Sequence, residues 1–122
     1  VPVALVTSSV RPMVEAFLSR LPEGTFDAVV TANDVENHKP DPEPYLRAAQ
    51  LLGVDPAGCV VLEDSPSGIG SGLAAGARVV AIPCIVPLPA QDGLSRVSSA
   101  ADLDIPLLEE IAAGSVVDWL DD

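Results

Sequence analysis

Aromatic side chains make up only 3% of this sequence of 122 residues, and lysine occurs once, as Lys39. A core poor in aromatic rings must be aliphatic, and a hydrophobic content of 48% supplies it and excludes a disordered chain. The 6 basic residues against 18 acidic ones give a net charge of −12, which repels nucleic acids and anionic membranes. We therefore expect no nucleic acid and no membrane as partner, and any anion site must be created locally.

Cysteine is scarce as well, with two residues, and no apolar run is long. Cys59 and Cys84 have neither the spacing of a zinc site nor the number that a disulfide framework needs, so we expect two buried thiols. The most apolar stretch, residues 79–90, is interrupted by prolines and too short to cross a bilayer. Since no signal peptide pattern is visible either, the expected location is the cytoplasm.

Short apolar runs alternate with helical patterns along the chain. Buried strands are expected at residues 3–6, 26–30, 60–62 and 79–82. Helices are expected at residues 10–21, 41–53, 65–76 and 107–113. The alternation predicts an α/β fold, a Rossmann-like doubly wound parallel sheet with helices on both faces. Gly68, Gly72 and Gly76 share one helix face, which would let that helix lie close to the sheet.

Polar residues follow the strands at their carboxyl ends, where ligands bind in such sheets. Thr7 and Ser8 offer a hydroxyl and N–H groups for an anion, or else a simple helix cap. Lys39 stands directly before Pro40 and Pro42, and we interpret it as a cation held on a stiffened loop at a functional site rather than as a solvated surface lysine. Glu63 and Asp64 end a buried strand and point to opposite faces, so one carboxylate can bind Mg²⁺ while the other supports it.

The order of these residues resembles motifs II, III and IV of the haloacid dehalogenase (HAD) superfamily of phosphotransferases. The matching strings are VALVTSS at residues 3–9, KPDP at 39–42 and VLEDSPSGI at 61–69. The resemblance covers roughly residues 3–85. The lysine–proline string and the Glu-Asp-Ser string are together highly specific for that family.

The resemblance implies a role for each candidate residue. Thr7, with the backbone of Ser8, would bind the transferring phosphoryl group, and Lys39 would neutralise charge on that group and on the nucleophile. Thr7 and Lys39 would thus be the catalytic residues. Asp64 would ligate Mg²⁺, and Glu63 would hold a metal-bound water or the ion itself.

One part of the family pattern is missing. Motif I, an Asp-x-Asp at the end of the central strand, supplies the nucleophile, and no Asp-x-Asp follows an apolar strand here. The string at 102–104 has that spelling but follows a polar segment and leads into a proline. The cap domain is missing as well. Together with the abrupt apolar start, this suggests that residues 1–122 are the C-terminal portion of a HAD core. Its partner would be the missing N-terminal segment of the same core, and the first and third strands would flank a vacant place.

The resemblance therefore implies a Mg²⁺-dependent phosphatase of a small phosphorylated metabolite, a sugar or polyol phosphate, acting through an aspartyl-phosphate. The chain alone is expected to be inactive. A β-phosphoglucomutase-like phosphotransferase would share motifs II to IV, and a non-catalytic module would fit the missing nucleophile. A signalling receiver domain uses similar residues, but its acidic residues come first in the chain, whereas here they come last.

Overall fold

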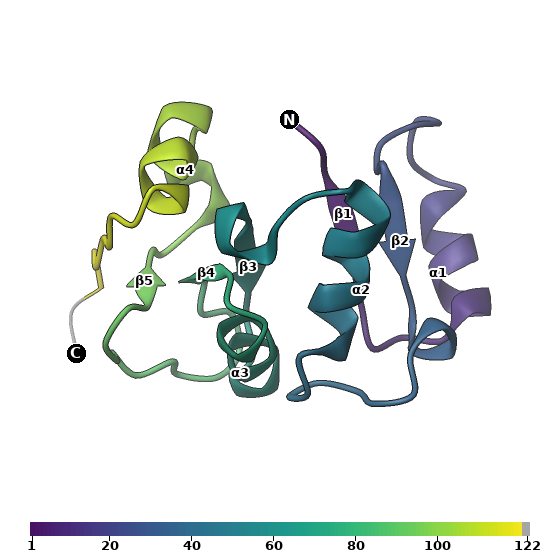
Figure 1. Ribbon diagram of the computed structural model, residues 1–122, viewed down its shortest axis with the longest axis horizontal. Coiled ribbons are helices and arrows are strands. Elements are labelled where there is room, and N and C mark those ends of the chain that lie inside the picture. The colour runs from purple at the N-terminus through teal and green to yellow at the C-terminus, as the bar shows by residue number, and fades with distance from the viewer. Residues whose placement is uncertain (121–122) are drawn as a thin grey trace.

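A computed structural model of the chain describes residues 1–120 and shows parallel strands alternating with helices (Figure 1). The elements are β1 (Ala4–Val6), α1 (Arg11–Leu18), β2 (Ala28–Val30), α2 (Glu43–Leu52), β3 (Val60–Glu63), α3 (Pro66–Ala74), β4 (Arg78–Ala81), β5 (Ser95–Arg96) and α4 (Ile105–Ala112). Short 3-10 turns lie at η1 (Ala32–Asp34), η2 (Pro56–Gly58) and η3 (Ala100–Asp102). The α/β class expected from the alternation is confirmed.

The strands of the described residues form two parallel sheets. β1 pairs with β2, and β4 lies between β3 and β5. α2 packs on the first sheet and α3 on the second, and the two helices contact each other. Within residues 1–120, β1 and β3 therefore each pair with a strand on one side only, as expected for a HAD sheet without its central strand.

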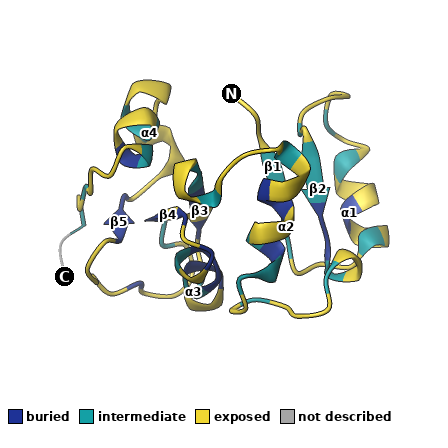
Figure 2. Cartoon of the chain, in the orientation of Figure 1, coloured by how far each residue is buried: buried dark blue, intermediate teal, exposed yellow. Residues whose placement is uncertain are grey.

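Burial differs among the strands (Figure 2). β4 is the centre of the core, since its last three residues are at most 1% exposed. Val79 and Ala81 pack against the α3 side, and Val80 packs against Ile111 of α4. The expectation of full burial is wrong for β1, which is half-buried throughout, and for β3, where Leu62 is 46% exposed. Both strands stand at the edge of a sheet.

Several ends and environments differ from the sequence expectations. Helix α1 begins after Val10 without a side-chain cap, so the Thr7–Ser9 segment does not cap it. β5 was not expected, because a pair of polar residues forms no apolar run. Cys59 is half-buried and Cys84 is exposed, so the expectation of two buried thiols is wrong. Among the described residues, no helix is long and apolar enough to cross a membrane.

Only one of the three glycines expected to face the sheet from α3 packs against its strands. Gly76 lies beyond the helix with a φ of 85°, and Gly68 faces the end of β3. At Gly72, by contrast, a Cβ would lie 2.8 Å from Cγ2 of Val79 and 3.2 Å from Cγ1 of Val61. The absence of a side chain at Gly72 therefore sets how closely α3 approaches the sheet.

Replacing Gly72 by alanine is expected to destabilise the fold. Gly70→Ala is the matched control in the same helix, since its Cβ would meet only Cβ of Pro40, at 3.4 Å. Both changes gain similar helix propensity, so the difference in free energy of unfolding measures the overlap at position 72. We expect that difference to be about 1–3 kcal/mol in urea denaturation. Equal stability of the two variants would contradict the close packing of α3.

Candidate active site

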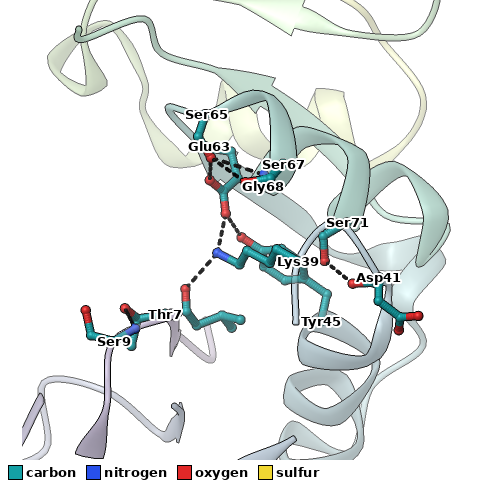
Figure 3. A network of polar contacts seen from close by, with 11 residues as sticks. Thr7, Ser9, Lys39, Asp41, Tyr45, Glu63, Ser65, Ser67, Gly68 and Ser71 are labelled. Atoms are coloured by element: carbon teal, nitrogen blue, oxygen red, sulfur yellow. Dashed lines mark hydrogen bonds and ion pairs between the residues drawn. The ribbon is translucent and has the colours of Figure 1, made fainter. Parts of the chain in front are cut away.

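Lys39 links the carboxyl ends of β1 and β3 (Figure 3). Its Nζ donates to the backbone oxygen of Val6 at 3.1 Å and to Oε2 of Glu63 at 2.6 Å. The side chains of Lys39 and Glu63 are only 10% and 7% exposed. A charge buried to this degree needs a partner, and each of the two supplies one for the other. The single lysine of the sequence therefore lies at the edge where ligands bind in parallel sheets.

The loop that carries Lys39 is fixed by the two neighbouring helices. The buried Ser71 of α3 donates its hydroxyl to the backbone oxygen of Asp41 at 2.7 Å. Glu43, at the start of α2, accepts the backbone N–H groups of residues 36 and 37 at 2.7 and 3.3 Å. The hydrogen bond from residue 36 is the largest cause that lowers the pKa of Glu43. These hydrogen bonds therefore fix the backbone of the loop that carries Lys39.

Tyr45 of α2 completes a cluster with Lys39 and Glu63. Its hydroxyl donates to the same Oε2 of Glu63 that accepts Lys39, and Nζ of Lys39 lies 5.0 Å from the centroid of its ring. Burial raises the pKa of Tyr45, and the hydrogen bond to Glu63 adds to that shift, so the phenol stays a donor. Tyr45 is not predicted as a site residue from the sequence, although it is the only tyrosine and lies close to the only lysine in the chain.

Gly68, in the first turn of α3, leaves the space that the Glu63 side chain occupies. A Cβ at this position would overlap with the carboxyl group of Glu63. The Gly68 N–H donates to Oγ of Ser65, the N-cap of α3, at 3.1 Å. Ser65 Oγ also lies 3.5 Å from Oε1 of Glu63. Gly68 is therefore a residue of the site, which the sequence pattern assigned to helix packing alone.

Thr7, Ser8 and Asp64 flank this cluster. Thr7 follows Val6 directly, but its N–H donates to the backbone oxygen of Val30 at 3.0 Å, so that N–H is not free for an anion. Its hydroxyl accepts the N–H of Ser9 at 3.1 Å. Ser8 and Asp64 are exposed, and no residue from 1 to 120 hydrogen-bonds either side chain.

The two adjacent carboxylates differ in what they can offer a metal ion. Oε2 of Glu63 is occupied by Lys39 and Tyr45, whereas the carboxylate of Asp64 is exposed. Proteins bind Mg²⁺ through one or two carboxylates together with waters and substrate phosphates, so Asp64 fits this ion. In the described part of the chain, no group of three or more His, Cys, Asp or Glu side chains is placed to hold a metal.

Residues 1–82 match the family described as haloacid dehalogenase-like hydrolase. The chain belongs to this family. Among curated relatives, Hexitol phosphatase A from Escherichia coli (strain K12) is 46% identical to this HAD-like chain over 84 residues. That match covers 67% of the chain and 38% of the relative.

Solved structures of HAD-like proteins share the fold. A HAD hydrolase of family IA, variant 3, from Entamoeba histolytica HM-1:IMSS matches with a TM-score of 0.78 at 25% identity, over 90% of this chain and 52% of the other. A putative β-phosphoglucomutase from Thermotoga maritima matches with a TM-score of 0.65 at 30% identity, over 93% and 51%. The HAD fold expected from the motifs is confirmed, and the chain spans about half the length of these proteins or less.

Proposed function

We propose that this HAD-like chain is the phosphate- and metal-binding part of a Mg²⁺-dependent phosphatase for a sugar or polyol phosphate. The observation that carries the proposal is the position of Lys39, which contacts the ends of both β1 and β3. Thr7 and Asp64 directly follow those two strands. The family and the hexitol phosphatase relative support the reaction class and the kind of substrate.

Phosphoryl transfer depends on positioning and on stabilisation of negative charge. The ammonium of Lys39 has three N–H donors. Two of them are used by Val6 and Glu63, which leaves one for a phosphoryl oxygen. The hydroxyl of Thr7 and the N–H of Ser8 would bind other oxygens of the same group. Asp64 would hold Mg²⁺, which when bound neutralises charge on the phosphoryl group.

The nucleophile in this proposal comes from outside residues 1–122. An aspartate-bearing strand would lie between β1 and β3, because these two strands have an unpaired side within the described residues. The aspartate would attack the phosphorus and break its bond to the sugar or polyol oxygen, which would leave as the protonated alcohol. Water would then hydrolyse the aspartyl-phosphate to the free aspartate and inorganic phosphate. The chain would thus be the C-terminal portion of a HAD core, and its partner would be the N-terminal segment of that core.

The chain by itself is expected to release no phosphate from p-nitrophenyl phosphate, since it lacks the nucleophile. A chimera that joins the chain to the N-terminal part of Hexitol phosphatase A should hydrolyse hexitol phosphates in the presence of Mg²⁺. The same chimera with Lys39→Met is the control for contaminating phosphatases. Turnover by the 122 residues alone would contradict the proposal that the nucleophile comes from another segment. A folded chimera without any turnover would contradict the function itself.

A phosphotransferase is the second candidate, favoured by the likeness to the putative β-phosphoglucomutase. Lys39, Thr7 and Asp64 would have the same tasks in both reactions, and only the acceptor of the phosphoryl group would differ. Loading the chimera with a radiolabelled phosphoryl group separates the two candidates. Label passing to a second sugar supports the phosphotransferase, and label appearing as inorganic phosphate supports the phosphatase.

A further inference from the structure

The cluster of Lys39, Tyr45 and Glu63 divides the tasks of the two adjacent carboxylates at the end of β3 (Figure 3). We propose that Tyr45 is a positioning residue that holds Glu63 on Lys39, so that Glu63 orients the ammonium and metal binding is left to Asp64. The metal-binding half of this inference rests on the proposed function. The positioning half concerns contacts within the chain and stands without it.

Two hydrogen-bond donors converge on one oxygen of Glu63. Lys39 and Tyr45 both donate to Oε2 of Glu63, while Oε1 has only the hydroxyl of Ser65 at 3.5 Å. Hydrogen bonds to charged groups are the strong ones, and the Glu63 side chain is 7% exposed. Turning this carboxylate toward a metal ion would break two such bonds where little water can replace them.

The residues around the Glu63 carboxylate fit this orientation of its side chain. Gly68 leaves open the volume that the Glu63 carboxyl group fills. A buried phenol hydroxyl needs a hydrogen-bond partner, and the carboxylate of Glu63 provides it for Tyr45. The side chain of Glu63 is thus enclosed by α2 on one side and by the first turn of α3 on the other.

The same contacts define the position of the Lys39 ammonium. A lysine stem is flexible, so a defined ammonium position requires contacts from several directions. Val6 and Glu63 accept from Nζ, and the face of the Tyr45 ring lies 5.0 Å away. The remaining N–H then has a fixed direction. Without the Tyr45 hydroxyl, Glu63 loses one of its two strong hydrogen bonds. The Lys39 ammonium is then held less firmly in its position.

Asp64 differs from Glu63 in its surroundings. Asp64 directly follows β3 and is exposed, and it makes no hydrogen bond to Lys39 or Tyr45, although its charge helps to raise the pKa of Tyr45. The charge of Glu63 is compensated by Lys39 at 2.6 Å. The exposed Asp64 carries its charge without an ion pair among residues 1–120. Of the two carboxylates, Asp64 is therefore the one that offers an uncompensated charge to a cation.

The chain allows a direct test, because it contains one lysine and one tyrosine. Labelling lysine with ¹⁵N and ¹³C gives a single ammonium signal by NMR. In Tyr45→Phe the ring stays beneath Lys39 and only the hydroxyl is lost, so we expect the ammonium protons to exchange with water on the order of tenfold faster. Tyr45→Leu removes the ring as well, so the difference in exchange rate between the two variants measures the contribution of the ring. An ammonium signal and exchange rate unchanged in Tyr45→Phe would overturn the positioning role.

Binding of Mn²⁺ to the chain, followed by electron paramagnetic resonance, tests the division between the carboxylates. We expect Asp64→Asn to weaken Mn²⁺ binding about tenfold or more, and Glu63→Gln to weaken it less than about threefold. Where Glu63→Gln does not fold, the double variant Lys39→Met/Glu63→Gln replaces it. Equal weakening by the two carboxylate variants would overturn the division. If the unaltered chain binds no Mn²⁺, both the proposed metal site and the metal-binding role of Asp64 are contradicted. The NMR signal of Lys39 still tests the positioning role of Tyr45 in that case.

Discussion

Replacing Lys39 by methionine is expected to lower the free energy of unfolding by about 3–5 kcal/mol, because it leaves a buried carboxylate without its cation. Glu63 is 7% exposed, and of its two strong bonds only the one from Tyr45 would remain. Domains of this size have a total stability of about 5–15 kcal/mol. The single change would therefore remove a large part of the stability of the fold.

The double variant Lys39→Met/Glu63→Gln separates the lost charge from the lost packing. Methionine keeps most of the apolar stem of Lys39, and glutamine keeps an acceptor for the Tyr45 hydroxyl. With both charges removed, most of the stability should return. Urea denaturation followed by circular dichroism measures all variants. Arg47→Met is the matched control, since it removes an exposed cation of α2 and should change stability by less than about 0.5 kcal/mol. A Lys39→Met variant as stable as this control would show that the buried pair contributes nothing.

The contact between Lys39 and Glu63 follows from signals that are visible in the sequence. Glu63 ends an apolar run, Lys39 stands directly before a proline-rich stretch, and the ends of parallel strands meet at one edge of a sheet. The division between Glu63 and Asp64 does not follow in this way. Alternation along the chain predicts that the two side chains point to opposite faces. It does not predict which of them points into the protein. The inward orientation of Glu63 depends on its hydrogen bonds with Lys39 and Tyr45, which lie 24 and 18 residues away in the sequence.

The parts of the fold that the sequence pattern misses depend on similar distant contacts. β5 is a strand because its backbone pairs with β4, and because Arg96 binds Asp118, 22 residues away, through Nε and one terminal nitrogen at 3.0 Å each. The partial exposure of β1 depends on its surroundings in the fold rather than on its own apolar residues. The early end of α1 is local: the Ser19 hydroxyl donates to the backbone oxygen of Ala16 at 2.7 Å, and Pro22 disfavours a helical residue before it.

In the chimera that carries a nucleophile, Asp64→Asn is expected to lower kcat on the order of 10²-fold or more. The amide has no negative charge with which to hold Mg²⁺, so the phosphoryl group would lose the cation that compensates its charge. Because Asp64 is exposed and makes no hydrogen bond with residues 1–120, the same change should leave the free energy of unfolding nearly unchanged. The combination of a large loss of rate with an intact fold distinguishes Asp64 from Lys39, whose removal should damage both.

Initial rates with a hexitol phosphate, measured over a series of Mg²⁺ concentrations, provide the test. The half-saturating Mg²⁺ concentration should rise in Asp64→Asn, since the variant lacks an anionic ligand. Asp55→Asn is the matched control, because it makes the same chemical change at an exposed residue that caps η2, with its carboxylate 2.9 Å from the N–H of Ala57. That control should keep kcat within about twofold, as expected for a surface position away from the reacting groups. A rate close to that of the unaltered chimera in Asp64→Asn would remove Asp64 from the site and leave Glu63 as the carboxylate to be tested for the metal.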